Sequence, residues 1–312
     1  MSVRVALVGA GRRRQGLGPF FARFFEELGA EVVALVGRSE ESLAQAQRQV
    51  AERIGRDVPA HLDLLEMAER ERPDAVVIAA PPESHLDHLG AALTAGLHVL
   101  CEKPLLWWCG DPVEGARELV QRFEEAGLVL MENVQWPLTL PAFFSLHPEA
   151  PRDRPRRFGM LLGPTSTGER MLVDSLSHPL SLMGALGVSG APTGITFRES
   201  EGSLAVSFSS ADTEAHIELR RAPEPPRPAA YEVDGYRAER RIHASDYRME
   251  FVDGDRCVPL PDPLREQVAA FLLALRQPGP VADHAIPARL AALRTIVEAY
   301  RRFEVDRSGG GV

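Results

Sequence analysis

Residues 3–18 read VRVALVGAGRRRQGLG, and this stretch decides the predicted fold. Val3 to Val8 is short, apolar and rich in β-branched residues, which predicts a buried strand. Gly9 and Gly11 follow it directly, and an apolar helical face runs from Phe20 to Leu28. A strand, a glycine-rich turn and a helix in this order predict a phosphate site, because glycines let the backbone approach the phosphate and the helix N-terminus stabilises its charge.

The same alternation of short apolar runs and helices continues to about residue 130. Further strands are predicted at Glu31–Val36, Asp74–Ala80, Leu97–Cys101 and Leu128–Met131. Further helices are predicted at Ser39–Ile54, at Ser84–Ala95 and from Asp111-Pro112 onward. Continuous apolar strands separated by helices indicate a parallel sheet covered on both faces. We therefore predict an α/β fold whose N-terminal part, residues 1–125, is a doubly wound dinucleotide-binding Rossmann domain.

The second half of the chain has a different pattern. Apolar residues alternate with polar or small ones at Leu204, Val206 and Phe208, and Asp234-Gly235 and Asp253-Gly254 are hairpin signals. Two helices are expected near Leu264–Leu275 and Pro287–Phe303. We predict a C-terminal α+β domain, residues 126–312, with a largely antiparallel sheet that binds substrate. A half-covered apolar sheet face would pair with a second copy, giving a homodimer or homotetramer.

Composition excludes several classes of protein. The net charge of −9 argues against a nucleic-acid partner, although a local arginine cluster can still bind a phosphorylated cofactor. The three cysteines form no metal-binding pattern, and such sparse usage suits a reducing cytoplasm. No run of 18 apolar residues predicts a membrane span. We expect a cytoplasmic protein with no metal, no membrane and no nucleic acid among its partners.

The end of the second predicted strand indicates which dinucleotide is bound. NAD-selective sites usually place Asp or Glu there, whereas this chain has Gly37, Arg38 and Ser39. Arg38 can pair with a 2′-phosphate and Ser39 can add a hydrogen bond, so NADP is predicted, with NAD as the alternative. Arg12, Arg13 and Arg14 can reach the same phosphate or stack on the adenine. Alternatively, these three and Arg38 are simply solvated loop residues. Arg14 also occupies the third glycine's place in the fingerprint, a role that Gly16 or Gly18 can fill.

Three residues are candidates for the chemistry. Lys103 follows a buried strand, at the edge where parallel sheets bind their ligands. A lysine at this place can polarise an oxygen of the substrate. The alternative is that Lys103-Pro104 forms a solvated turn, as isolated Lys-Pro pairs usually do. Asp174 and His178 are four residues apart, so on one helix they would share a face. By spacing alone, an ordinary helix pair is the better explanation of them.

Two long segments carry a resemblance to a known family. Ala79–His85 reads AAPPESH and Ala91–Pro104 reads AALTAGLHVLCEKP. This ordered succession resembles the glucose–fructose oxidoreductase and inositol dehydrogenase (Gfo/Idh/MocA) family. The resemblance extends through the N-terminal half and resumes at Asp174–His178 and in the closing helices.

The resemblance implies an NAD(P)-dependent dehydrogenase or reductase of a sugar, cyclitol or related polyhydroxylated substrate. It implies Lys103, Asp174 and His178 as the catalytic set, and a cis Lys103–Pro104 bond. With the residues above, the predicted cofactor-binding set is Gly9, Gly11, Arg12, Arg13, Arg14, Gln15, Gly16, Arg38, Ser39, Ala80, Pro81, Pro82, His85, Glu102, Lys103, Asn133 and Trp136. His85 is expected to line the nicotinamide ribose or the substrate mouth, or to be an ordinary helix-start residue.

The chain also departs from the family pattern. Ser181 stands where members often have an acidic residue, and Val134-Gln135 changes the polarity of the predicted pocket. Two alternatives therefore stay open beside the dehydrogenase. One is a dinucleotide-binding sensor or regulator without chemistry, and the other is a reductase of a C=C or C=N substrate.

Overall fold

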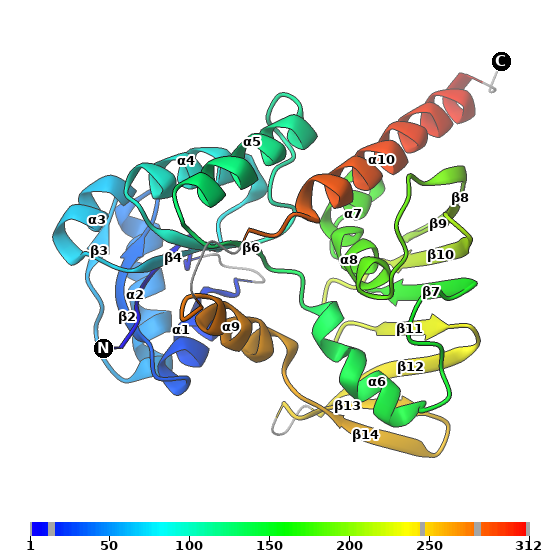
Figure 1. The fold of residues 1–312 in the computed structure, drawn as a ribbon, viewed down its shortest axis with the longest axis horizontal. Helices are drawn as coiled ribbons and strands as arrows, with labels where there is room; N and C mark the ends of the chain where they lie inside the picture. Colours follow the sequence, from blue (N-terminus) through cyan, green and yellow to red (C-terminus); the bar gives the residue numbers. More distant parts are fainter. Residues whose placement is uncertain (1, 12–15, 244–246, 278–281, 310–312) are drawn as a thin grey trace. The chain divides into compact units, whose positions relative to one another are not determined.

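The computed structural model describes residues 2–11, 16–243, 247–277 and 282–309 (Figure 1). The chain forms two compact units. The first comprises Met1–Asn133 and Leu264–Pro287, and the second comprises Val134–Pro263 and Ala288–Val312. The structure thus divides the chain differently from the predicted boundary at 125/126. The strand β6 (Leu130–Glu132) still belongs to the first unit's sheet, and a later segment returns to that unit.

The first unit is built on a six-stranded parallel sheet in the order β3-β2-β1-β4-β5-β6. Besides β6, its strands are β1 (Arg4–Val8), β2 (Glu31–Val36), β3 (Ala60–His61), β4 (Ala75–Ile78) and β5 (His98–Cys101). Each is parallel to its neighbours. The order reverses between β1 and β4, which is the arrangement of dinucleotide-binding domains, and such sheets bind their ligands at the carboxyl ends of these strands. The predicted Rossmann domain is confirmed.

The helices described in the first unit are α1 (Gly18–Glu27), α2 (Glu40–Ile54), α3 (Leu64–Glu71), α4 (His85–Thr94), α5 (Pro112–Glu125) and α9 (Pro263–Ala274). Side chains cap three of them, at Ser39 for α2, Asp63 for α3 and Asp111 for α5. The Asp111 carboxylate accepts from two backbone amides at the start of α5, as its position before Pro112 predicts. Helix α9 lies beside α1 (Figure 1). It belongs to this unit because its apolar side joins the core of α1, where the rings of Phe25 and Phe271 meet edge to face at 6.3 Å.

The second unit is built on an eight-stranded sheet in the order β14-β13-β12-β11-β7-β10-β9-β8. Its strands are β7 (Arg157–Leu162), β8 (Thr193–Ser200), β9 (Ser203–Ser210), β10 (Thr213–Arg220), β11 (Ala229–Val233), β12 (Tyr236–Ile242), β13 (Met249–Asp253) and β14 (Arg256–Leu260). Strands β7 and β10 pair in parallel, and the other neighbours pair antiparallel. Asp234-Gly235 forms the predicted turn between β11 and β12, with positive φ at both residues. The largely antiparallel sheet is confirmed.

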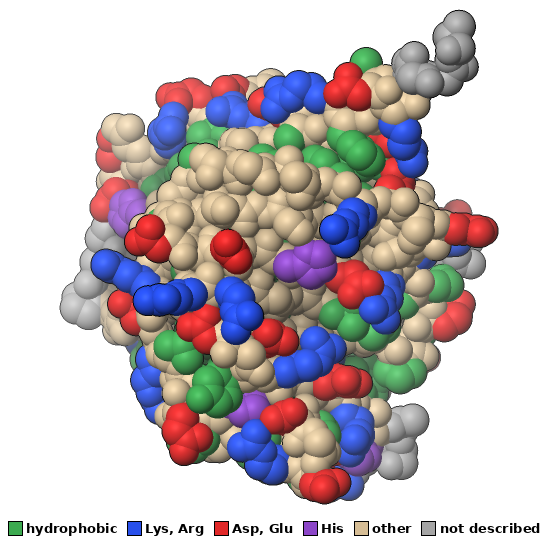
Figure 2. Space-filling view, turned by 90° about the vertical axis from the view of Figure 1, so that its right-hand side faces the viewer, with side chains coloured by type: hydrophobic (Ala, Val, Ile, Leu, Met, Phe, Trp, Pro, Cys, Tyr) green, Lys and Arg blue, Asp and Glu red, His purple; other side chains and the backbone are tan. Residues whose placement is uncertain are grey.

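Helices cover one face of this second sheet. They are the short η2 (Trp136–Thr139), α6 (Leu140–Leu146), α7 (Gly168–Ser175) and α8 (Ser177–Ala185), and α10 (Ile286–Gly309) lies next to β8 (Figure 1). Helix α10 packs on β8 through the rings of Phe197 and Tyr300. The opposite face is open. Figure 2 shows acidic, basic and histidine side chains mixed over this side of the unit. The expectation of an apolar open face was therefore wrong, because the outward positions of β10 carry Glu214, His216 and Glu218.

Candidate active site

Gly9 lies where the ends of β1 and β4 meet, and no side chain fits at its position. Its amide donates to the carbonyl of Val36 at 2.9 Å, and its φ of +79° is one that L side chains rarely adopt. A Cβ at Gly9 would lie 2.7 Å from both Cα and N of Ala80, which follows β4. Only glycine therefore fits where these two strand ends meet.

Two further glycines complete a backbone cradle at the start of α1. A Cβ at Gly11 would lie 2.3 Å from the carbonyl oxygen of Ser42, and one at Gly18 would lie 2.4 Å from Cα of Ala10. Gly18, the first residue of α1, thus takes the close-packing role, and Gly16 lies in the loop just before it. Arg12, Arg13, Arg14 and Gln15 lie outside the described residues. The cradle fits a dinucleotide's pyrophosphate, which needs bare backbone next to a helix N-terminus.

The end of β2 carries no carboxylate at the position next to the cradle. A Cβ at Gly37 would lie 2.9 Å from Cδ2 of Leu43, so the structure leaves little room for a larger residue there. Arg38 is exposed. The hydroxyl of Ser39 caps α2 by accepting from the amide of Ser42 at 3.3 Å, as the sequence predicts.

The turn after β5 presents Lys103 at the same edge of the sheet. Lys103 is partly exposed, and its bond to Pro104 is cis, as the resemblance implies. The backbone amide of Leu105 donates to Oε1 of Glu132 at 2.7 Å. Glu132, at the end of β6, is only 2% exposed. Sequence reasoning did not assign Glu132 a role, and its only signal was an acidic residue within an apolar strand.

Asn133 ties the same turn to the next strand. Its amide nitrogen donates to the carbonyl of Cys101 at 2.7 Å, and Nδ2 donates to the Glu102 carboxylate. The side-chain oxygen Oδ1 is buried and has no hydrogen-bond partner among the described residues. A buried amide oxygen is normally satisfied, so this atom fits a ligand that donates a hydrogen bond at the end of β6.

His85 lies behind this edge and does not line an opening. The residue is the first of α4 and is fully buried, with an exposed fraction of 0%. Its Nδ1 lies 3.1 Å from the carbonyl oxygens of both Pro104 and Leu105, and Nε2 lies 3.0 Å from that of Ala80. The expectation that His85 faces the ribose or the substrate mouth was wrong, because three main-chain carbonyls enclose its ring. Pro81 and Pro82, between Ala80 and α4, remain at least partly exposed.

Cys101, which precedes this turn, is not suited to nucleophilic chemistry. Burial raises the pKa of its thiol well above the usual value, and the carboxylates of Glu102 and Glu132 raise it further. Because the thiolate is the reactive form, Cys101 stays a neutral, inert side chain.

In the second unit, Asp174 and His178 lie on two successive helices and not on one. Helix α7 ends at Ser175 and α8 begins at Ser177, with Leu176 between them in the right-handed helical region. The prediction of a single helix was wrong in this detail. The Asp174 carboxylate lies 3.8 Å from Nε of Arg170, and both Asp174 and His178 are partly exposed.

An aromatic and cationic cluster surrounds His178. The ring of Trp136 meets that of His178 edge on at 6.5 Å, and the guanidinium of Arg240 lies 5.5 Å from the centroid of Trp136. Burial lowers the pKa of Arg240. Trp136, which was predicted to bind cofactor, lies in the same unit as His178. Arg240 was missed, because nothing in the alternating pattern of its strand distinguishes it from its exposed neighbours Glu239 and Arg241.

Ser181, which stands where family members often have an acidic residue, forms a hydrogen bond within its own helix. Its hydroxyl donates to the carbonyl of His178 at 2.8 Å, within helix α8, and its side chain is buried. The position is thus used for local helix bonding.

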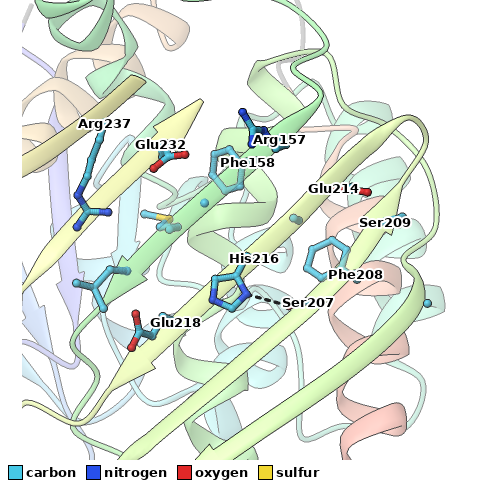
Figure 3. A pocket seen from close by; sticks show the side chains of 15 residues that line it. Arg157, Phe158, Ser207, Phe208, Ser209, Glu214, His216, Glu218, Glu232 and Arg237 are labelled. Atoms are coloured by element: carbon cyan, nitrogen blue, oxygen red, sulfur yellow. Dashed lines mark hydrogen bonds between the residues drawn. The ribbon is translucent and has the colours of Figure 1, made fainter. Parts of the chain in front are cut away.

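A shallow hollow of about 440 Å³ lies on the open face of the second sheet. Figure 3 shows Arg157, Glu214, His216 and Glu232 pointing into it, with His216 hydrogen-bonded to Ser207 at 2.8 Å. None of the predicted site residues lines it. Within the described residues, no cluster of three histidine, cysteine or acidic side chains is placed to bind a metal, and no helix is long and apolar enough to cross a bilayer.

Comparison with known proteins agrees with the first unit's geometry. Residues 3–134 match the family GFO_IDH_MocA, described as an oxidoreductase family with an NAD-binding Rossmann fold. A glycosyl hydrolase family 109 protein from Shewanella amazonensis is 34% identical over 139 residues, which cover 42% of this chain and 29% of that protein. D-glucoside 3-dehydrogenase from Escherichia coli K12 is 33% identical over 128 residues, covering 41% and 33%. Residues 3–134 therefore match the Gfo/Idh/MocA oxidoreductase family model, which spans less than half of this chain.

The fold likeness extends over the whole chain. UDP-N-acetylglucosamine 3-dehydrogenase GnnA from Acidithiobacillus ferrooxidans has a TM-score of 0.72 at 21% identity, covering 96% of this chain and 98% of that one. The sequence matches to the two relatives above, in contrast, span only about a third of each relative's length.

Proposed function

We propose that this protein is an NAD(P)-dependent dehydrogenase or reductase that acts on a carbinol or carbonyl carbon of a sugar, cyclitol or related polyhydroxylated molecule. The dinucleotide, when bound, accepts or supplies the hydride. The observation that carries the proposal is the side-chain-free cradle of Gly9, Gly11 and Gly18, which lies at the same edge of the sheet as the Lys103 turn. That edge is where open α/β sheets bind their ligands.

Three residues are assigned to the chemistry. Lys103 hydrogen-bonds the reacting oxygen of the substrate, where its fixed positive charge stabilises developing negative charge. His178 takes up or returns the hydroxyl proton, because an imidazole titrates near neutral pH. Asp174 positions a substrate hydroxyl. Asn133, with its buried Oδ1, supports cofactor binding at the end of β6.

We further propose that NADP is preferred over NAD. Support comes from Arg38, which is exposed at the end of β2, and from Gly37, where packing against Leu43 leaves little room for an acidic side chain. An acidic residue there would accept hydrogen bonds from an unmodified ribose, whereas an arginine pairs with a 2′-phosphate.

The partners proposed are a small-molecule substrate and further copies of this chain, with the open face of the second sheet as the homo-oligomer interface. Opposite charges such as Arg157 and Glu214 lie in register on that face, so an interface there would be polar. Gly159→Arg, which projects a large cation from this face, should yield monomers in sedimentation analysis. Glu224→Arg, in an exposed loop, should leave the oligomer intact. Equal sedimentation of both variants counts against this interface.

The three free cysteines fit a cytoplasmic location.

Turnover against a substrate panel tests the proposal. The protein is incubated with NADP or NADPH and with sugars, cyclitols, their keto derivatives and glycosides, and nicotinamide absorbance is followed. We expect turnover with at least one polyhydroxylated substrate and faster reaction with NADP than with NAD. Tight dinucleotide binding without turnover across the panel would reject the enzyme and favour a sensor. Turnover only with C=C or C=N substrates would reject the assigned substrate class.

A further inference from the structure

The ring of His85 joins two segments that end at the ligand edge. Ala80 follows β4, and Pro104 and Leu105 follow β5. Three carbonyl oxygens from these segments lie within 3.0–3.1 Å of the two ring nitrogens. The residue is fully buried, so water does not reach the ring. The His85 side chain thus connects the segment after β4 to the segment after β5.

These contacts determine how many protons the ring carries. A carbonyl oxygen only accepts hydrogen bonds, and a neutral imidazole has one N–H and one lone pair. Either neutral tautomer would leave a lone pair pointing at a carbonyl oxygen at 3.0–3.1 Å, whereas an imidazolium donates from both nitrogens. We propose that His85 is held as an imidazolium that clamps the Lys103 turn to the end of β4, and that it acts as a positioning residue for Lys103.

The surroundings compensate for a buried cation. Burying a charge is costly unless it is hydrogen-bonded or paired. The Leu105 peptide offers its carbonyl to His85 and its amide to the buried carboxylate of Glu132 at 2.7 Å. A cation and an anion thus lie on opposite sides of one peptide group. His88 on α4 interacts electrostatically with His85, and Asp87 interacts with His88.

The pKa of His88 offers a way to measure the charge of His85. It lies one turn further along α4, and its pKa is lowered first by burial and then by the charge of His85, while Asp87 raises it. Removing a cation at position 85 should therefore raise the pKa of His88. Removing a neutral ring should leave that contribution unchanged.

The clamp has a catalytic consequence that rests on the proposed function. The two carbonyls held by Nδ1 belong to the two residues directly after Lys103, so the ring fixes the backbone that carries the reacting amine. A displacement of about 1 Å in a catalytic group can slow turnover roughly 10²-fold. His85 would then affect the rate through Lys103 without touching substrate.

Nitrogen NMR of the full-length protein at pH 7 tests the clamp directly. We expect both ring nitrogens of His85 to be protonated and His88 to carry one proton. In His85→Phe, we expect the pKa of His88 to rise. A deprotonated ring nitrogen on His85 at pH 7, or an unchanged pKa of His88 in His85→Phe, would overturn the proposal.

Kinetics of matched variants tests the positioning role. His85→Phe should lower kcat by about 10²-fold with little change in substrate KM or dinucleotide Kd. His85→Gln, which restores donors on one side only, should recover part of kcat, and His88→Phe should match the unaltered protein. A KM effect alone, or no rescue by Gln, contradicts positioning. If the unaltered protein shows no turnover, the proposed function fails while the NMR result still decides the protonation of His85.

Discussion

The amide of Leu105 donates to the carboxylate of Glu132 at 2.7 Å, and this contact joins the turn after β5 to the end of β6. Glu132 is 2% exposed, so the bond forms away from water. Together with Asn133, which donates to Glu102, it holds both sides of Lys103. These contacts position the backbone that carries Lys103.

Replacing Glu132 should lower the free energy of unfolding, and the loss should be larger when the new side chain cannot accept a hydrogen bond from the Leu105 amide. Glu132→Leu leaves the buried Leu105 amide without an acceptor, which costs about 1–3 kcal/mol of unfolding free energy. Glu132→Gln keeps a side-chain carbonyl oxygen and should cost less. Urea denaturation measures both values. Equal losses in the two variants would show that the Leu105 contact does not account for the effect.

Glycine at position 9 should be required for dinucleotide binding. Gly9→Ala adds a Cβ 2.7 Å from the backbone of Ala80 and should weaken the Kd at least tenfold, about 1.4 kcal/mol. Gly29→Ala is the matched control, because Gly29 also has a positive φ of +82° but nothing within 4 Å of its Cβ position. Calorimetric titration of the dinucleotide should show an unchanged Kd for Gly29→Ala. Equal weakening in both variants would point to general strain.

Arg38 should distinguish the two dinucleotides. Losing a charge-assisted hydrogen bond costs about 1.5–3 kcal/mol, so Arg38→Ala should weaken NADP binding by roughly 10–100-fold and leave NAD binding unchanged. Titrations of both cofactors with both proteins measure this. Tighter binding of NAD than NADP by the unaltered protein would reject the predicted preference.

Thiol labelling should follow the pKa of Cys101. Burial and two nearby carboxylates raise that pKa, so at pH 8 Cys101 remains a neutral thiol. Cys257 is exposed and should react with iodoacetamide in the folded protein, whereas Cys101 should react only after unfolding. Peptide mass spectrometry identifies the labelled residue. Comparable native labelling at both positions would contradict the burial of the β5 end.

The local features of the first unit could be predicted because they depend on neighbouring residues. The apolar run of β2 was predicted over its observed bounds, and the caps at Ser39 and Asp111 were read from their positions before helices. The glycine cradle was also predicted, although the loop length obscured whether Gly16 or Gly18 packs on Ala10.

The features that were missed depend on contacts between distant parts of the chain. The two-residue strand β3 is too short to give a period, and the return of α9 to the first unit depends on Phe271 meeting Phe25. The enclosure of His85 by carbonyls from β4 and β5 follows from strand order, which spacing along the sequence does not reveal.

A double-mutant cycle between Lys103 and His178 tests the central claim most directly. The claim is that these residues, from different units of the chain, act on the same reacting centre. Lys103→Met and His178→Asn should each lower kcat by roughly 10²–10⁴-fold while dinucleotide binding persists. Residues that act as one unit are strongly non-additive, so the double variant should be about as slow as the slower single variant. A loss equal to the product of the two single losses would contradict the account.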